Sequence, residues 1–324
     1  MRRGTASLSV DLDNQWSYMK THGNPEWREL PSYLPVVVPR LLALFRKCGV
    51  KTTFFLVGAD AAQTQHAEIF RSIPADGHEV GNHSYHHEPW LHLYSEADLE
   101  REISDAEAAI EGATGIRPAA FRGPGYSLSE TVLKVLIRRG YLFDASTLPT
   151  FLGPLARIYY FWTANLTAEE RATRKKLFGT FRDGLRPLRP YTWRLNAGTI
   201  LEIPVTTMPG ARVPIHFSYF LYIARYSRAA ALSYFRSALT ICKASGLQPS
   251  LLIHPLDVMG RGEAPPLDFF PAMQMDAAEK VGLMEHALEM VTDSFEPIAM
   301  CGHARRLLAG SEAARTELRW EPSA

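Results

Sequence analysis

Short runs of apolar and β-branched residues alternate along the chain with longer segments in which apolar positions recur at helical spacing. The runs expected to form strands are 8–11, 52–57, 79–82, 119–122, 141–144, 200–205, 250–254 and 297–300. Because most neighbouring runs are separated by a segment long enough for a helix, the pattern predicts an α/β protein with a mainly parallel sheet.

Three of the intervening segments carry clear helix signals. Segment 34–48 has apolar residues on one helical face and ends before Gly49. Segment 96–110 follows Ser95, a residue type that caps helix N-termini, and segment 128–139 ends in two cations and a glycine. Seven or eight such βα units in about 300 residues fit a distorted (β/α)7–8 barrel better than a doubly wound open sheet, which is the second alternative.

Segment 147–198 interrupts this rhythm. It opens with an aromatic stretch, continues with a charged one and ends rich in proline and arginine. A connection of this length is far longer than an ordinary βα loop, so we expect a lid-like insertion with its own structure. The chain is therefore expected to form one domain over residues 1–310 that contains this insertion, followed by a tail over 311–324.

Composition and charge narrow the classes of partner. The 324 residues include 46% hydrophobic ones, which is enough for a large core, and the formal net charge of +1 gives no electrostatic footprint for nucleic acid. The three cysteines are far apart and odd in number, which indicates neither a disulfide framework nor a cysteine-based zinc site. No nucleic-acid partner is expected, and the sequence indicates no particular oligomeric state.

The N-terminal region indicates where the protein resides. A strand is predicted directly where a signal peptide would need an apolar region, and no run approaches the ~20 apolar residues of a membrane span. We therefore expect a cytoplasmic protein, with peripheral contact at the inner membrane surface as an open alternative.

Two of the expected strands end in residues suited to metal chemistry. Asp11 and Asp13 occupy positions i and i+2 at the end of the first strand, so both carboxylates can reach one site at the end where barrel enzymes hold their chemistry. His83 and His87 follow the third strand, and residues four apart on one helical turn share a face. Two imidazoles and one carboxylate leave metal positions open for water and substrate, which is typical of a catalytic site. Taken alone, the aspartates also fit turn residues, and the histidines also fit surface or core positions.

Two further strand ends carry candidate catalytic residues. Residues 121–127 have the sequence FRGPGYS, in which a Gly-Pro-Gly loop can expose backbone N–H groups while Arg122 points into the site. A tight turn with a solvent-facing arginine is the alternative. His254 ends an almost wholly apolar strand, as an active-site acid or base would, although a core histidine fits the same pattern.

Together these segments resemble the successive motifs of the polysaccharide deacetylase family, also called the NodB-homology family or carbohydrate esterase family four. The family's aspartate pair, His-[Ser/Thr]-x-x-His, Arg-x-Pro-x-Tyr and late Leu-x-His occur here in the same order. HSYHH at 83–87 and RGPGY at 122–126 match without a gap. The resemblance covers roughly residues 7–255 apart from the insertion.

The chain departs from the family pattern in two places. The family usually has adjacent aspartates, whereas Leu12 separates them here, as in a variant branch. The acidic residue that tunes the catalytic histidine in the family has no clear counterpart, and the candidates are Glu202, Asp257 and Asp144.

The resemblance implies a role for each motif residue. The implied metal ligands are Asp13, His83 and His87, and the implied catalytic residues are Asp11, His254, Arg122 and Tyr126. The metal would be a divalent ion, with Zn²⁺ expected. Asp11 would be the general base held by Arg122, the backbone N–H of Tyr126 would stabilise the oxyanion, and His254 would protonate the leaving amine.

The implied activity is removal of an N-acetyl or other N-acyl group from a sugar or polysaccharide, including a lipid-linked or cell-envelope glycan. The alternatives are a deformylase or another amide hydrolase of the same superfamily, and a non-catalytic carbohydrate-binding relative. Aromatic residues of the insertion are expected to stack on sugar rings, to form the core of a lid or to contact a membrane. They are Tyr159, Tyr160, Phe161, Trp162, Tyr191 and Trp193.

Overall fold

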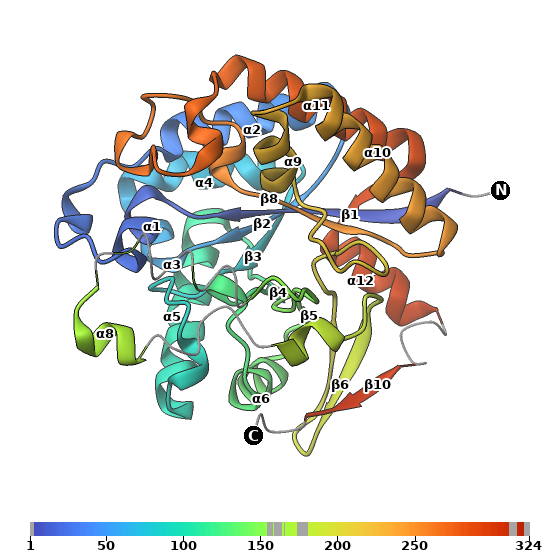
Figure 1. Ribbon diagram of the computed structural model, residues 1–324. Coiled ribbons are helices and arrows are strands. Elements are labelled where there is room, and N and C mark those ends of the chain that lie inside the picture. The colour runs from blue at the N-terminus through green and yellow to red at the C-terminus, as the bar shows by residue number, and fades with distance from the viewer. Residues whose placement is uncertain are drawn as a thin grey trace.

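One twisted sheet runs through the centre of the protein, and helices cover its outside (Figure 1). The computed structural model describes residues 3–153, 158, 164, 166–173, 181–310 and 316–320. Within these residues, ten strands form the sheet in the order β10-β6-β7-β5-β4-β3-β2-β1-β8, and β9 pairs with β1. The strands are β1 (Gly4–Leu12), β2 (Thr53–Leu56), β3 (Glu79–Asn82), β4 (Ala120–Phe121), β5 (Phe143–Asp144), β6 (Tyr191–Leu195), β7 (Gly198–Glu202), β8 (Ser250–Ile253), β9 (Phe295–Ala299) and β10 (Glu317–Arg319).

Helices follow most of the strands. The α-helices are α1 (Gln15–Thr21), α2 (Leu34–Cys48), α3 (Gly58–Ala61), α4 (Ala67–Ala75), α5 (Glu96–Thr114), α6 (Glu130–Arg139), α8 (Ala168–Thr173), α9 (Phe217–Ala224), α10 (Arg228–Ala244), α11 (Ala277–Ser294) and α12 (Met300–Ala309). The short 3₁₀ helices are η1 (Trp27–Glu29), η2 (Thr64–His66), η3 (Leu91–Leu93), η4 (Pro124–Tyr126), η6 (Phe181–Leu185), η7 (Pro255–Asp257), η8 (Pro265–Leu267) and η9 (Pro271–Gln274). Among the described residues, every helix is too short or too polar to span a bilayer.

The predicted distorted (β/α) barrel is confirmed, and its distortion is an open seam. The pairs from β8 through β1, β2, β3, β4 and β5 to β7 are all parallel. Just beyond β7, the Thr206 N–H donates to Ser250 O at 2.9 Å, and the Ser250 N–H donates to Thr206 Oγ1 at 2.7 Å. These two bonds bridge β7 and β8 where a closed barrel would have a continuous ladder.

The eight expected strands and three expected helices are all confirmed. Ser95 Oγ accepts the Asp98 N–H and caps α5, while Gly49 and Gly140 end α2 and α6 in the left-handed conformation at φ 65° and 75°. These caps are local chemistry, which explains why the sequence alone located the ends of the helices closely.

The first strand shows how alternation positions the site. Leu8 and Val10 are fully buried and pack in the main core with α2 residues. Ser9 and Asp11, which point the opposite way as strand geometry requires, are also buried and bind Arg122 inside the barrel. One face of the strand therefore places the Asp11 carboxylate in the barrel interior, and the opposite, apolar face packs against the surrounding helices.

The described part of the 147–198 segment decides between the alternatives for two aromatic residues. Tyr191 and Trp193 lie on β6, which pairs antiparallel with β7, and both are buried. Trp193 packs against Tyr191 and Trp320 at ring separations of 5.0 and 5.2 Å. Trp193 is a core residue and cannot be a sugar platform, because strand alternation turns it inward.

The remaining predictions for this segment concern other residues. Tyr159, Tyr160, Phe161 and Trp162 lie outside the described residues. The limits of the domain at 1–310 and of the tail at 311–324 stay predictions, although residues Glu317–Arg319 form β10 and pair with β6.

A pair of buried carboxyl groups lies where β5 and β7 end. Asp144 and Glu202 are register partners and are fully buried. Ser146 Oγ donates to Asp144 at 2.6 Å, while Thr147 Oγ1 and Trp193 Nε1 donate to Glu202 at 2.7 and 3.0 Å. Burial raises the pKa of both carboxyls, and the charge of Asp144 raises the pKa of Glu202 further, so folded Glu202 keeps its proton to a higher pH than a free glutamate does.

This retained proton predicts a pH-dependent stability. Above the ordinary Glu pKa of 4.5 the unfolded chain loses a proton that folded Glu202 keeps. The contribution of Glu202 to the unfolding free energy is therefore fully present below the ordinary Glu pKa. It is lost as pH rises through the higher pKa of Glu202 in the folded protein. As pH rises from about 5 to about 8, the unfolding free energy of Glu202→Gln should increase relative to that of the wild type. Urea unfolding at both pH values measures this, and a constant difference between the two proteins would contradict it.

Candidate active site

The two aspartates predicted from the first strand lie together at its C-terminal end. Asp11 is the penultimate residue of β1, and Asp13 follows the strand directly. Both are 5% exposed, so their carboxylates are almost fully withdrawn from water. Carboxylates buried to this degree require a positively charged or hydrogen-bonding partner.

The histidines lie in an irregular loop after β3, and the helical turn expected from their spacing is wrong. Ser84 and His87 have positive φ angles of 63° and 52°. The loop is held instead by side-chain acceptors. Asn82 Oδ1 accepts the Ser84 N–H, Ser84 Oγ accepts the His87 N–H, and Glu102 accepts the N–H groups of the two residues between. Local hydrogen bonding of this kind replaces helical bonds.

The loop nevertheless brings the three predicted ligands together. His87 Nε2 lies 2.9 Å and His83 Nε2 lies 3.3 Å from Asp13 Oδ1. One donor atom from each of the three residues lies within 4.8 Å of the others, and all three are buried. The cluster could therefore hold a metal ion, in the arrangement of two histidines and one carboxylate.

Electrostatics couples these three groups strongly. Burial alone would raise the pKa of Asp13, but the neighbouring imidazoles of His87 and His83 hold it well below its ordinary value. Burial opposes the charged form of His83, yet Asp11 and Asp13 raise its pKa. The cluster is thus a concentrated site of negative charge whose partner must be a proton or another cation.

The hydrogen bonds of His83 test whether a metal ion fits. His83 Nδ1 lies 2.6 Å from the carbonyl oxygen of Arg122, so the Nδ1 proton points at that carbonyl. In the neutral ring Nε2 then carries a lone pair, which faces the Asp13 carboxylate at 3.3 Å. Asp13 Oδ1 is also buried and accepts no well-oriented hydrogen bond among the described residues, although His87 Nε2 lies 2.9 Å away. A divalent cation satisfies both atoms, and the carbonyl bond of His83 is the outer-shell contact that histidine ligands usually make.

Arg122 is the anchor of the second predicted group. Its side chain is fully buried, and Nη1 donates to Asp11 Oδ1 at 2.6 Å and to Ser9 Oγ at 2.9 Å. Nε donates to Ala145 O at 3.0 Å, and the guanidinium lies 4.4 Å from the centre of the Phe55 ring. Asp11 is therefore fixed by a buried charge-assisted hydrogen bond, with Oδ2 left toward the metal-ligand cluster.

The loop after Arg122 turns as the sequence predicts, but its backbone donor is engaged. A Cβ on Gly123 would lie 2.2 Å from Ser127 O, and Gly125 has φ 57°. Tyr126, also at a positive φ of 61°, donates its N–H to Gly123 O at 2.9 Å. That bond argues against the expected free oxyanion donor at Tyr126. Its side chain instead lines the pocket, where burial and the charge of Asp11 raise the pKa of the phenol.

His254 reaches the same pocket from the end of β8. Ser218 Oγ lies 3.2 Å from His254 Nδ1 and also bonds to the Asp257 carboxylate. Asp257 Oδ2 in turn accepts the His254 backbone N–H at 2.8 Å. Of the three acidic candidates considered from the sequence, Asp257 is therefore the one beside His254. Burial and the neighbouring His254 lower the pKa of His216, whose ring lies 5.9 Å away.

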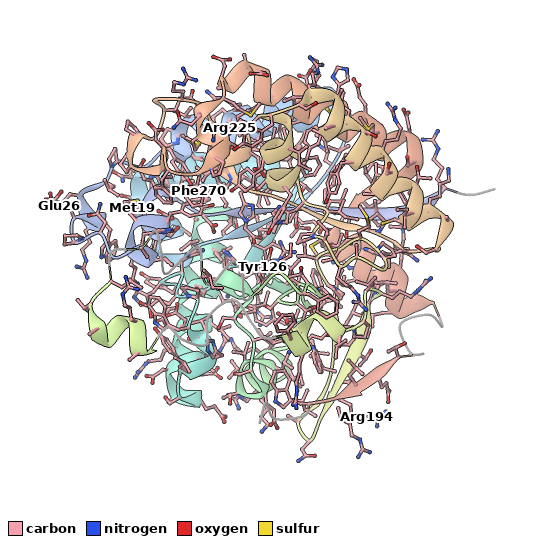
Figure 2. All side chains as sticks on the ribbon, in the orientation of Figure 1. Met19, Glu26, Tyr126, Arg194, Arg225 and Phe270 are labelled. Carbon is pink, nitrogen blue, oxygen red and sulfur yellow. The ribbon has the colours of Figure 1, made fainter. Side chains whose placement is uncertain are left out.

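A pocket of about 580 Å³ joins these groups. Six of the seven predicted site residues line it, and Arg122 lies beneath it in contact with Asp11. An aromatic part of the wall comes from α1, α9 and the segment before η9. It consists of Tyr18, Tyr219, Tyr222 and Phe270. Figure 2 labels Tyr126 and Phe270, which come from segments far apart in the sequence. Leu152 brings the start of the 147–198 segment to the same wall.

Sequence reasoning missed Ser218 and the aromatic wall. The run FSYFLYIA at Phe217–Ala224 is a signal that could have found them, because it places rings on more than one side of a short helix. The sequence alone does not show how this helix is oriented against the barrel, so it could not indicate which of those rings face the site.

The fold and site define a barrel protein with polar chemistry at the C-terminal ends of its parallel strands. A family model for polysaccharide deacetylase matches residues 29–143, which include the histidine loop and the Arg122 loop. Asp11, Asp13 and His254 lie outside the matched residues. A peptidoglycan deacetylase-like protein from Gibberella zeae is 31% identical over 168 residues, which cover 49% of this chain and 47% of that protein.

Solved structures share the fold. A candidate polysaccharide deacetylase from Mycobacterium smegmatis superimposes with a TM-score of 0.65 at 19% identity, over 99% of this chain and 96% of the other. An allantoinase superimposes with a TM-score of 0.59 at 16% identity, over 95% of this chain and 91% of the other. The resemblance of the chain to the polysaccharide deacetylase family is confirmed. The segments matched in the first curated relatives span 29 to 47% of those proteins' lengths, and at these identities the two structures show the fold alone.

Proposed function

We propose that the protein is a metal-dependent hydrolase that removes an N-acetyl group from an amino sugar of an oligosaccharide or polysaccharide. The observation that carries the proposal is the convergence of the Asp13, His83 and His87 donors with Asp11 and His254 in one pocket. The resemblance to a peptidoglycan deacetylase-like protein supports an N-acetylated glycan as the substrate class.

A divalent ion held by Asp13, His83 and His87, Zn²⁺ in this proposal, would polarise the acyl carbonyl and make water nucleophilic near neutral pH. The protein supplies the ligand atoms for that ion. They already lie close together, and the three residues that carry them are buried. His83 is further fixed in orientation by the Arg122 carbonyl.

Asp11 and His254 provide the proton transfers. Asp11 Oδ2 accepts a proton from the attacking water, and Arg122 orients the carboxylate by donating a hydrogen bond to Oδ1. His254 gives a proton to the amide nitrogen as the C–N bond breaks, so that the products are an amine and acetate. Amide hydrolysis needs a base and an acid in this way, and both line the same pocket.

Three alternatives remain distinct from this proposal. The same residues would hydrolyse an N-formyl group or open a ring amide, and one solved structure of similar fold is an allantoinase. A non-catalytic carbohydrate-binding relative would need neither Asp11 nor His254. A lipid-linked amino sugar is a further version of the substrate.

The experiment is an acetate-release screen on the metal-loaded protein. The substrates are N-acetylglucosamine oligomers, peptidoglycan fragments, lipid-linked amino sugars, N-formyl sugars and allantoin, with products identified by mass spectrometry. Acetate from an N-acetylated glycan is expected. Turnover of only the formyl or ring-amide substrate would replace the proposed substrate, and binding without turnover would favour the non-catalytic alternative.

The Ser218 contact predicts a positioning effect on catalysis. Ser218→Ala should lower kcat about two- to tenfold with little change in KM, because one hydrogen bond that orients the His254 ring is lost. Ser218→Thr should restore most of the rate. Steady-state kinetics on an N-acetylated oligosaccharide measures this, with Ser245→Ala at the exposed end of α10 as the control. A rise in KM alone would mean that Ser218 contacts substrate instead.

A further inference from the structure

A second pocket, of about 400 Å³, lies on the other side of α1 from the candidate active site. Helical periodicity directs different side chains of α1 into the two pockets. Trp16 and Lys20, four residues apart, line the second pocket, whereas Tyr18, Thr21 and His22 line the first. One short helix after β1 therefore forms a wall of both pockets.

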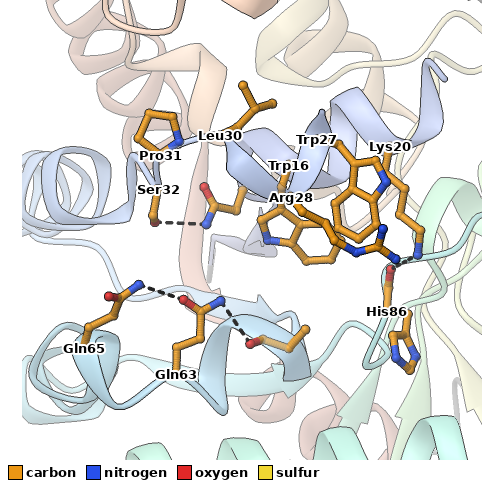
Figure 3. Close-up of a pocket in the computed structure, with 12 residues that line it drawn as sticks. Trp16, Lys20, Trp27, Arg28, Leu30, Pro31, Ser32, Gln63, Gln65 and His86 are labelled. Atoms are coloured by element: carbon orange, nitrogen blue, oxygen red, sulfur yellow. Dashed lines mark hydrogen bonds between the residues drawn. The ribbon is translucent and has the colours of Figure 1, made fainter. Parts of the chain in front are cut away.

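The second pocket has an aromatic side and an amide-bearing side. Figure 3 shows Trp16, Trp27 and Arg28 facing Gln63 and Gln65 across the opening. The two indole rings lie 5.5 Å apart at an angle of 34°. Trp16 Nε1 donates to the buried Asp60 carboxylate at 3.0 Å, which fixes the position of that ring.

The polar groups of the pocket keep hydrogen-bonding capacity for a ligand. Gln65 Nε2 donates to Gln63 Oε1 at 2.8 Å, and the Gln65 side chain is exposed, so its amide can also bond outward. The Arg28 guanidinium lies 4.3 Å from the centre of the Trp27 ring, and among the described residues it makes no ion pair. Trp27 thus holds an exposed cation at the rim by a cation–π contact.

Packing does not account for this arrangement. In the described part of the chain, neither Trp16 nor Trp27 belongs to the three hydrophobic clusters that form the core. A binding site typically combines large aromatic side chains that lie outside the core with polar groups, here the exposed amide of Gln65 and the guanidinium of Arg28. A pyranose ring offers an apolar C–H face and a rim of hydroxyls, which match an indole wall and facing amides.

We infer that this second pocket binds a further sugar unit of the same oligosaccharide whose N-acetyl group enters the first pocket. The inference rests on the proposed function for its substrate class. The two pockets are separated by about one helix diameter, roughly 10–12 Å, which a short oligosaccharide spans. Lys20, which lines the second pocket, forms an ion pair with Glu88, the chain neighbour of Pro89 in the wall of the first pocket, and the oligosaccharide would cross this pair.

The test compares oligosaccharides of different lengths. Metal-loaded wild type and Trp27→Ala are titrated calorimetrically with N-acetylglucosamine, its short oligomers and its long oligomers, and with peptidoglycan glycan strands. Trp27→Ala should weaken binding of long ligands about tenfold, which is about 1.4 kcal/mol, and should leave the monosaccharide unchanged. Gln65→Ala, which removes an exposed amide without touching the core, should act in the same direction.

Tyr226→Ala is the matched control, because Tyr226 is 82% exposed with Arg225 over its ring at 5.6 Å and lines neither pocket. It should bind all ligands as the wild type does. Equal affinity of Trp27→Ala and wild type for every length, or equal losses at all lengths, would overturn the inference while acetate release still supports the proposed function. Length- and Trp27-dependent binding without any acetate release would instead retain the pocket and refute the proposed function.

Discussion

Asp11→Asn is expected to lower kcat at least about a hundredfold while the protein still folds and binds its metal ion. The asparagine oxygen can continue to accept the Arg122 hydrogen bond now made by Asp11 Oδ1 at 2.6 Å. What the variant loses is the ability to take a proton at the second oxygen, which faces His83 and the metal-ligand cluster. General bases contribute about 10²–10⁴-fold to rate, so the loss should be large.

Steady-state kinetics, metal analysis and thermal unfolding of the same preparation separate a lost base from a lost metal ion or a lost fold. Ser9→Ala is the matched control, because Ser9 Oγ accepts from the same Arg122 Nη1 at 2.9 Å but does not line the pocket. Its kcat should stay within a few-fold of the wild type. If Asp11→Asn kept turnover within about tenfold, Asp11 would not be the general base.

The parallel sheet could be predicted because its strands are buried on both sides. A fully buried strand such as β8 appears in the sequence as a short continuous apolar run, whereas a half-exposed strand would alternate with polar residues. The convergence of Asp13, His83 and His254 followed from topology, since the C-terminal ends of parallel strands share one end of a barrel. The sequence did not need to specify their distances.

Geometry within loops could not be predicted in the same way. The spacing of His83 and His87 indicated a helical turn, but the bonds from Asn82, Ser84 and Glu102 select positive φ angles instead. One of these partners, Glu102, comes from α5 and is distant in sequence. Backbone conformations that depend on such long-range acceptors leave no periodic signal.

The roles of the tryptophans could not be assigned from the sequence. For Trp193 the sequence left open sugar stacking, a lid core or a membrane contact, and the structure places it in the core on β6 beside Glu202. No sequence pattern indicated a role for Trp16 or Trp27, yet they line a pocket and lie outside the core clusters. An aromatic residue is informative only once its strand or helix face is known.

His83→Ala and His87→Ala are each expected to abolish binding of about one divalent ion per chain. His83 and His87 supply the two Nε2 atoms at 3.3 and 2.9 Å from Asp13 Oδ1, and one histidine and one carboxylate cannot complete the same site. The readout does not depend on activity. A metal ion that binds only the folded protein raises unfolding free energy by about 2.7 kcal/mol at a hundredfold excess over Kd, so wild type should show a metal-dependent rise in Tm.

His86→Ala is the control for this experiment, because His86 lies between the two ligands but its exposed ring bonds to Glu102, outside the metal-ligand cluster. It should keep both the metal stoichiometry and the metal-dependent rise in Tm, whereas His83→Ala and His87→Ala should lose both. Elemental analysis after dialysis against Zn²⁺, Mn²⁺ and Co²⁺ in turn would also show which ion the site prefers. Retained stoichiometry in both ligand variants would refute the metal assignment and leave the buried Asp13 carboxylate balanced by a protonated histidine, since the raised pKa of His83 favours that state.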